Sequence, residues 1–379
     1  MNNFNINLSD EILLIIECSK EEPSYIYIKK YINQIKNWNN FIFLVKSHGV
    51  LPLVYNSLKS CENLDLPSFV MNKLKELYFI IAKENMMLSS ELIKVTKAFD
   101  FMDIDYISFK GPTLSKLSYG NIIQRQYCDL DILIKYKDIK SVINLLKEFE
   151  YESEYSNLNE INLKYIKVIS FYNKKLGTEI EIHCELISST YAINLDSIDF
   201  FNLTNNIKIY NNNIKSFNKE FLFIYLCIHG SKHIYERISW ITDINKCLID
   251  KTFNWKLIVK FAKELNIERI VYSSIYLASI TFDTSLPNYI KSNMTDINKL
   301  RSISENILSS IDKNDKISLR SLSILLSQRE GLCKKINLIL KSFFYIKETD
   351  IKFIKLPKYL YFIYFIVRPF RILSKKSIK

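Results

Sequence analysis

The spacing of apolar residues changes in the middle of this chain. Of all the sequence features, this change most narrows the range of folds that the chain can adopt. Within residues 109–150 helical spacing gives way to alternation, and Asp129 and Asp131 are separated by the apolar Leu130. Alternate residues of a β-strand point to opposite faces, so both carboxylates project from one face. The stretch predicts a strand, a tight turn, a short helix, a carboxylate-bearing strand and a long helix.

Helical patterns surround this mixed segment on both sides. Before it, apolar residues recur at spacings of three and four, interrupted by Pro and Gly. The predicted helices there are Leu8–Cys18, Tyr25–Ile35, Trp38–Ser47, Leu51–Leu58 and Phe69–Phe99. From about Phe200 onward the helical spacing returns. We therefore expect an α+β fold with three domains, in which a small mixed β-sheet core (101–200) is flanked by an N-terminal helical region (1–100) and a C-terminal helical region (201–379).

A second pair of predicted strands supplies a further acid. The segments Ile166–Tyr172 and Thr178–Cys184 alternate and flank a short turn, which predicts a hairpin. In the second strand Glu179, Glu181 and His183 share one face. Carboxylates that converge from adjacent strands are suitable ligands for a pair of Mg²⁺ ions. For either strand alone, an exposed polar face is the alternative interpretation.

The turn after the first predicted strand has features of a phosphate site. Lys110 and Gly111 lead into a helix whose free N–H groups would face a cleft, and Pro112 stands where its missing N–H costs nothing. Arg125 precedes the carboxylate strand and could bind a phosphate through two hydrogen bonds. A structural partner for this arginine is an equally good interpretation.

The net charge of +12 comes from the C-terminal end of the chain. Residues 316–379 hold fifteen Lys and Arg and three acids, whereas the two signs balance in the remainder. This excess suits a nucleic acid, an anionic substrate or a membrane face, and a solvated helical surface is the simpler interpretation. The apolar run Tyr359–Val367 could lie on an anionic membrane, but we favour its docking into the helical domain.

Cysteine usage and hydropathy indicate a cytoplasmic protein. The seven cysteines are scattered without a CxxC pair, which is typical of reduced thiols. The first residues lack the basic segment and the small-residue cleavage site of a secretory signal. We expect no transmembrane segment, because no apolar run approaches the roughly 18 residues that a membrane-spanning helix needs.

The order of these motifs resembles the polymerase-beta-type nucleotidyltransferase superfamily, and in particular a bacterial nucleotidyltransferase family within it. The matching positions are Phe109-Lys110-Gly111, Tyr119, Arg125, Asp129-Leu130-Asp131-Ile132-Leu133 and Glu181-Ile182-His183. Further similar positions are His229, Trp240, Asp243 and Arg368–Leu373. The chain departs from the usual pattern in two places: a Lys-Gly-Pro-Thr turn replaces Gly-Ser, and Glu181 stands where Asp is usual.

The resemblance implies a nucleotidyltransferase that uses two Mg²⁺ ions. It would move a nucleotidyl group from a nucleoside triphosphate such as ATP to an acceptor hydroxyl and release pyrophosphate. The implied catalytic metal ligands are Asp129, Asp131 and Glu181, and the implied nucleotide contacts are Lys110, Gly111 and Arg125. Glu181 would also act as general base. His183 would either support a ligand or pack within its strand, and we favour packing.

Basic and aromatic residues of a later segment are candidates for the opposite wall of the cleft. Lys232 and Arg237, together with His183, could contact the acceptor or the triphosphate, although packing of Trp240 in a helix is the simpler interpretation of this segment. His229 and His233 are four residues apart, as in zinc sites on helices. No Glu follows the first histidine and no third ligand stands nearby, which disfavours zinc.

The sequence leaves the acceptor open, and it could be a small molecule, a protein or RNA. A second class of function also stays open. The chain could be a catalytically inactive nucleotidyltransferase-like protein that binds RNA or a protein partner through its basic C-terminal surface.

Overall fold

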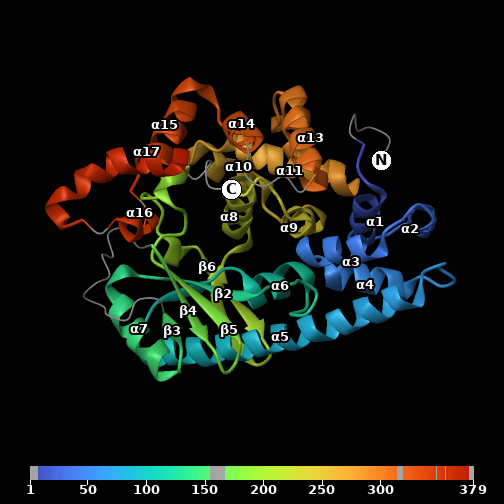
Figure 1. Ribbon diagram of the computed structural model, residues 1–379, viewed down its shortest axis with the longest axis horizontal. Coiled ribbons are helices and arrows are strands. Elements are labelled where there is room, and N and C mark those ends of the chain that lie inside the picture. Colours follow the sequence, from blue (N-terminus) through green and yellow to red (C-terminus); the bar gives the residue numbers. More distant parts are fainter. Residues whose placement is uncertain (1–6, 154–166, 314–318, 347, 355, 375–379) are drawn as a thin grey trace.

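The computed structural model describes residues 7–153, 167–313, 319–346, 348–354 and 356–374. It has an α+β fold in which helices flank a small mixed sheet, so the predicted fold class is confirmed (Figure 1). The first five helices are α1 (Asp10–Cys18), α2 (Tyr25–Ile32), α3 (Trp38–Ser47), α4 (Leu51–Ser60) and α5 (Ser68–Phe101). They match the helices that the apolar spacing predicts, within a few residues at each end.

The longest helix, α5, links the N-terminal helices to the sheet. It runs along the lower edge of the molecule in Figure 1, from the blue helices to a position beneath the strands. Its first half packs on α4, and the buried Leu74 belongs to the N-terminal core. Further along, the fully buried Leu92, Val95 and Phe99 belong to the core around the sheet. One amphipathic helix therefore ties the two parts together.

The main sheet has five strands in the order β1-β2-β5-β4-β3. Their bounds are β1 (Tyr106–Ser108), β2 (Asp129–Ile134), β3 (Glu152–Ser153), β4 (Val168–Asn173) and β5 (Thr178–His183). The central strands β2 and β5 are parallel, and every other neighbouring pair is antiparallel. Asp131 pairs with Glu181 in the β2–β5 register, so their side chains project from the same face.

The opposite face of the sheet is apolar. Ile132, Ile180 and Ile182 are buried there in a core shared with α5 and α7 (Ile139–Glu148). Alternation along β2 and β5 thus separates an apolar face from a polar one, as the sequence predicts. The turn from β1 leads into α6 (Gly111–Tyr119), which begins beside the polar face.

A second, two-stranded sheet was not expected from the sequence. Strands β6 (Thr204–Ile209) and β7 (Asn212–Phe217) form an antiparallel hairpin that packs on β1 and α6. The expectation that helical spacing returns from Phe200 is therefore wrong for this segment. Asn is rare in strands, so its frequency here weakens the sequence pattern that would predict a strand. The two-residue turn Tyr210-Asn211 has the usual length of a hairpin turn, and Tyr210 has a positive φ of 50°.

Helices make up the rest of the described chain, beginning with α8 (Lys219–Lys232) and α9 (Ile238–Ile249). The following helices are α10 (Trp255–Glu264), α11 (Glu268–Phe282), α12 (Asn288–Asn293), α13 (Ile297–Lys313), α14 (Leu319–Ser327), α15 (Gly331–Phe344), α16 (Glu348–Phe353) and α17 (Tyr364–Ser374). They lie above the sheet in Figure 1. No helix in the described ranges is both long and apolar enough to cross a membrane.

The apolar packing does not stop at residues 100 and 200. The end of α5 and the buried Ile209 and Ile214 of the hairpin share the core of the five-stranded sheet. The N-terminal and C-terminal helices also share a core, because α1 packs on α11. The division into three domains, with boundaries after residues 100 and 200, stays a prediction.

Candidate active site

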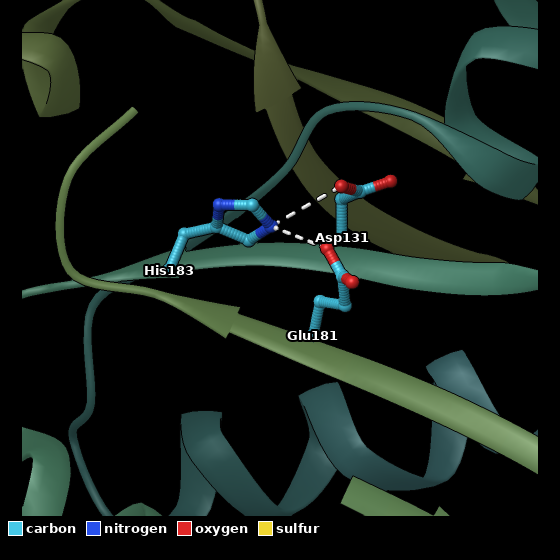
Figure 2. Close-up of side chains that lie close together, drawn as sticks. All are labelled: Asp131, Glu181 and His183. Carbon is cyan, nitrogen blue, oxygen red and sulfur yellow. Dashed lines mark ion pairs between the residues drawn. The ribbon is translucent and has the colours of Figure 1, made fainter. Parts of the chain in front are cut away.

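Two carboxylates and an imidazole meet on the polar face of the sheet (Figure 2). One ligand atom from each of Asp131, Glu181 and His183 lies within 4.8 Å of the others. His183 Nε2 is 3.2 Å from Asp131 Oδ1 and 3.3 Å from Glu181 Oε2. The cause is the register of parallel strands β2 and β5, which places Asp131 opposite Glu181 and brings His183 one pleat further along.

The unpartnered atoms of this cluster suit a divalent cation. Asp131 is fully buried, and its Oδ2 has no hydrogen-bond partner among the described residues. His183 Nε2 likewise makes no hydrogen bond of good geometry, although two carboxylate oxygens are close. Buried polar atoms are rarely left without partners. Two carboxylates and one imidazole form a donor set that divalent metal ions accept, so the residues fit a metal.

A lysine from the β1–α6 turn neutralises part of this negative charge. Lys110 Nζ is 2.8 Å from Asp131 Oδ1. Burial would lower the pKa of Lys110, but the Asp131 carboxylate outweighs burial and raises it, so the ammonium stays charged. Burial would likewise raise the pKa of Asp131, and Lys110 and His183 outweigh it and hold that pKa below its usual range. The two groups stabilise each other's charged forms.

Asp129 lies at the edge of the cluster. It points to the same face as Asp131 and lines the adjacent cavity, but it is not among the three residues whose ligand atoms converge. Burial and the negative charge of Asp131 raise the pKa of Asp129, and Lys110 partly offsets them. The structure thus brings together Asp131 and Glu181 of the predicted trio, adds His183, and leaves Asp129 beside them.

The contacts of His183 match both roles considered from the sequence, packing within its strand and support of a ligand. Its ring packs edge-on against Phe109, with centroids 5.1 Å apart, which agrees with the favoured packing role. The same ring directs Nε2 toward the carboxylates. Burial lowers the pKa of His183, but the Asp131 and Glu181 carboxylates outweigh burial and raise it.

Gly111 is required by the close approach of the turn to strand β2. Its φ is +54°, and a Cβ there would meet the carbonyl oxygen of Asp129 at 3.2 Å. Gly111 begins α6, with Lys110 at the N-cap position and proline in the first turn. The glycine therefore lets the helix N-terminus lie directly against the carboxylate strand.

Arg125 has a buried protein partner, which was one of its two predicted roles. Its Nε donates to Asp243 Oδ1 at 2.9 Å and its Nη2 donates to Asp243 Oδ2 at 3.0 Å. Tyr119 Oη adds a third donor, 2.7 Å from Asp243 Oδ1. Tyr119 of α6, Arg125 and Asp243 of α9 thus form one hydrogen-bond network. The sequence singled out Tyr119 and Asp243 only through the family resemblance. Arg125 also lines the cavity.

A cavity of about 590 Å³ opens above the cluster. Lys110, Asp129, Glu181 and His183 belong to its lining, and so do Gly49 of the turn between α3 and α4 and residues of α8 and α9. The basic residues predicted for the opposite wall, Lys232 and Arg237, line this cavity as well. The structure therefore gathers the predicted site residues around one cavity, except for Gly111 and the buried Asp131, which are not part of its lining.

Aromatic rings form one wall of the cavity. Tyr225 of α8 lies close to Lys110, whose Nζ is 5.8 Å from the ring centroid. His229, His233 and Trp240 continue this wall, with ring centroids 4.8 to 5.3 Å apart. Within the described residues, the two histidines belong to no group of three potential metal ligands, and the low expectation for zinc stays a prediction. Sequence reasoning missed Tyr225, because it predicted only a core position on α8.

The acid–histidine cluster, the lysine-glycine turn and the mixed sheet are those of a nucleotidyltransferase-like protein. The chain belongs to the family described as "Uncharacterised nucleotidyltransferase", whose family model matches residues 35–283. This match confirms the resemblance drawn from the sequence. It covers the sheet, the cavity and all the predicted site residues, and it ends before α12.

A solved structure is also similar to this chain. It is described as the crystal structure of an antigenic nucleotidyltransferase-like protein from Paracoccidioides brasiliensis, and it is 15% identical, with a TM-score of 0.31. The match covers 52% of this chain and 97% of the other. A search of curated proteins found no match.

Proposed function

We propose that this protein is a nucleotidyltransferase that depends on a divalent cation and transfers a nucleotidyl group from a nucleoside triphosphate to an acceptor hydroxyl, with release of pyrophosphate. The observation that carries the proposal is the convergence of Asp131, Glu181 and His183 beside Lys110 at the base of a cavity. Family membership supports the class of reaction.

The acids are proposed to hold the metal. Asp131 and Glu181 would supply carboxylate oxygens, His183 a nitrogen, and Asp129 a further oxygen for a second ion. We propose Mg²⁺, with two ions as the expected number; Mn²⁺ shares its preference for carboxylate oxygens, and an imidazole nitrogen is a more usual ligand of transition metals than of Mg²⁺. When bound, the metal would neutralise charge on the triphosphate and stabilise an in-line displacement.

Protein side chains would supply the remaining steps. Glu181, which is partly exposed at the cavity, would accept the proton of the acceptor hydroxyl, and Lys110 would neutralise charge near the reacting phosphate. Gly111 would let the triphosphate approach the N-terminus of α6. We propose that Arg125 contributes to nucleotide binding by holding the wall of the cavity through Asp243, because its guanidinium already donates to that carboxylate.

The opposite wall would bind the acceptor or the outer phosphates. Lys232 and Arg237 line the cavity and carry exposed positive charge. Trp240 and the two histidines beside it offer ring faces on which a base could stack. The acceptor itself, whether small molecule, protein or RNA, is left to experiment. A cytoplasmic location remains a prediction supported by seven free cysteines.

One observation favours a non-catalytic alternative. The Lys110 ammonium lies against Asp131 at 2.8 Å, where it neutralises a carboxylate that a metal would otherwise bind. An inactive nucleotidyltransferase-like protein that binds RNA or a protein partner would keep this contact and need no metal.

Double substitution of the two strand acids separates these alternatives. The protein is incubated with each triphosphate labelled at the α-phosphate, together with cell extract and Mg²⁺ or Mn²⁺, and label is followed into small molecules, protein and RNA. We expect transfer by the natural protein and at least a roughly thousandfold loss in Asp129→Ala/Asp131→Ala.

The control is Asp105→Ala, an exposed acid that pairs with Lys135 outside the cavity, and it should leave transfer unchanged. Equal transfer by the double variant, or no transfer by the natural protein to any acceptor pool, would reject the enzymatic proposal in favour of the binding role.

A further inference from the structure

The end of the chain carries an exposed apolar surface that the proposed function does not use. On α15, Leu332, Ile336, Leu340 and Phe344 are spaced by four residues and are 72, 46, 50 and 43% exposed. Residues four apart lie on one side of a helix, so these side chains form a stripe. A single exposed apolar residue needs no explanation, but a continuous stripe does.

A second exposed stripe lies on the neighbouring segment. Phe362, Phe365, Ile366 and Phe370 are between 47 and 69% exposed. These positions follow the helical spacing through the last turn of the η4 segment (Lys358–Ile363) and α17. Helix α17 packs on α15, and both lie at one end of the molecule in Figure 1. We call these eight residues the C-terminal apolar face.

This arrangement corrects part of the sequence interpretation of Tyr359–Val367. Docking into the helical domain was expected, and Tyr364 and the following Arg368 are indeed buried. The Tyr364 hydroxyl donates to the carbonyl oxygen of Ile354. The other side of the segment, including Phe362 and Phe365, remains exposed. Docking therefore accounts for one side of the segment and leaves the other available to a partner.

Buried ion pairs hold the C-terminal apolar face in place. Arg368 Nη1 is 2.7 Å from Asp350 Oδ2, and Arg371 Nε is 2.8 Å from Asp350 Oδ1. Arg368 Nη2 also donates to the carbonyl oxygen of Ser342 at 2.7 Å. The arginines of α17 thus join it to the Asp350 carboxylate of α16 and to a backbone carbonyl of α15.

The charge of this region indicates the chemistry of the partner. Residues 316–379 carry fifteen basic residues and three acids. Among the acids, Asp350 is buried against two arginines, and Glu330 lies 3.8 Å from Lys334. Little negative charge therefore opposes the basic residues, and an anionic partner is favoured.

We propose that the C-terminal apolar face binds peripherally to an anionic lipid membrane. Interfacial helices combine exposed Phe, Leu and Ile with Lys and Arg, as this region does. Nucleic acid is a poorer fit, because aliphatic residues such as Leu332, Leu340 and Ile366 offer no ring on which a base could stack. A second copy of this chain would bring a second excess of positive charge to the same surface.

Membrane binding here would place the cavity close to a lipid surface. Helix α15 packs on the 3₁₀ turn Ser189–Tyr191, and the preceding Ser188 lines the cavity. The Arg329 guanidinium, just before α15, donates to the carbonyl oxygen of Tyr191 at 2.6 Å. The surface and the cavity wall are therefore mechanically connected, although membrane binding does not depend on the proposed reaction.

The test is co-sedimentation of the full chain with vesicles. We expect binding to vesicles of phosphatidylcholine mixed with phosphatidylglycerol, weaker binding to phosphatidylcholine alone, and a decrease at high salt. The variant Phe365→Ser/Ile366→Ser/Phe370→Ser should lower the partition coefficient at least about tenfold. The control Ile26→Ser/Phe43→Ser/Phe79→Ser, which alters exposed apolar residues elsewhere, should leave it unchanged.

Melting curves show whether each variant is folded, and Ile366→Ser alone serves if the triple variant is not. The proposal is overturned if the natural protein does not bind the anionic vesicles, or if both triple variants lose binding equally. It is also overturned if the C-terminal variant abolishes binding to an RNA oligonucleotide or breaks a dimer seen by light scattering while vesicle binding persists.

Discussion

Two buried ion pairs border the cavity, and they differ in how completely their carboxylates are satisfied. Asp243 accepts hydrogen bonds from Tyr119 Oη, Arg125 Nε and Arg125 Nη2, so both of its oxygens have partners. Asp131 has the Lys110 ammonium on one oxygen, and the described part of the chain offers no partner to the other. Both carboxylates are almost fully buried.

The difference indicates what each pair is for. A buried charge that has all of its hydrogen bonds is stable as it stands and has no capacity for a ligand. A buried carboxylate with a free oxygen carries a desolvation cost that a bound cation would remove. We therefore assign a structural role to the Arg125–Asp243 pair and a ligand-binding role to Asp131.

Loss of the satisfied pair should have the largest effect on stability. In Asp243→Ala, Arg125 is left buried without a partner, and the free energy of unfolding should fall by about 3–5 kcal/mol. Denaturant titration followed by circular dichroism measures the change.

The matched control is Tyr119→Phe, which removes one donor and leaves the arginine paired. It should cost only about 1 kcal/mol. If Asp243→Ala unfolds no more easily than Tyr119→Phe, the pair is not the structural element that its geometry indicates.

For Asp131, whose carboxylate has an oxygen without a partner among the described residues, the expected effect is on metal binding. At a hundred times its dissociation constant, Mg²⁺ or Mn²⁺ should stabilise the natural protein by about 2.7 kcal/mol. Asp131→Ala and Glu181→Ala should abolish this gain, because each removes a carboxylate of the cluster. Thermal melting with and without the cation measures the effect.

Tyr119→Phe is again the control, and its response to the cation should equal that of the natural protein. Undiminished stabilisation of Glu181→Ala by the cation would show that the metal binds elsewhere. This readout needs neither substrate nor turnover, so it tests the cluster independently of the reaction.

Local sequence patterns predicted most of the helices and strands that carry the site residues. The alternation of Asp129 and Asp131 with apolar residues fixed which face of β2 carries the acids, and the same reasoning placed Glu181 on its strand. The N-terminal helices followed from apolar spacing within a few residues. These features depend on neighbours in sequence, which is why they could be inferred.

Contacts between residues far apart in the chain could not be predicted from the sequence. Arg125 and Asp243 are 118 positions apart, and only the fold shows that they pair. The register that brings His183 to Asp131 joins two parallel strands across a long connection, and no local signal sets it. The β6–β7 hairpin was missed because its strands are rich in Asn and Lys, which are depleted from most strands.

His48 is another buried side chain with polar atoms that have no hydrogen-bond partner among the described residues, and it shows whether such a side chain is necessarily a ligand site as proposed for Asp131. Among the residues that the structure describes, neither of its ring nitrogens has a hydrogen bond of good geometry, but it lies outside the acid cluster. Burial lowers its pKa to about 4, the Glu236 backbone partly offsets this, and the positive charge of Arg237 adds to it. The imidazole is therefore neutral in the folded protein at pH values where the unfolded chain binds a proton.

The pH dependence of stability follows from this difference. The unfolded chain protonates His48 below a pH of about 6.5, and the folded protein does so only near its own lower pKa. Stability is thus fully present above pH 6.5 and is lost as the pH falls toward 4, by about 3 kcal/mol at most. His48→Leu should flatten this part of the profile, whereas Ser47→Ala should not. An unchanged slope in His48→Leu would mean that the ring is hydrated or paired in solution, and that its lack of partners cannot be compared with that of Asp131.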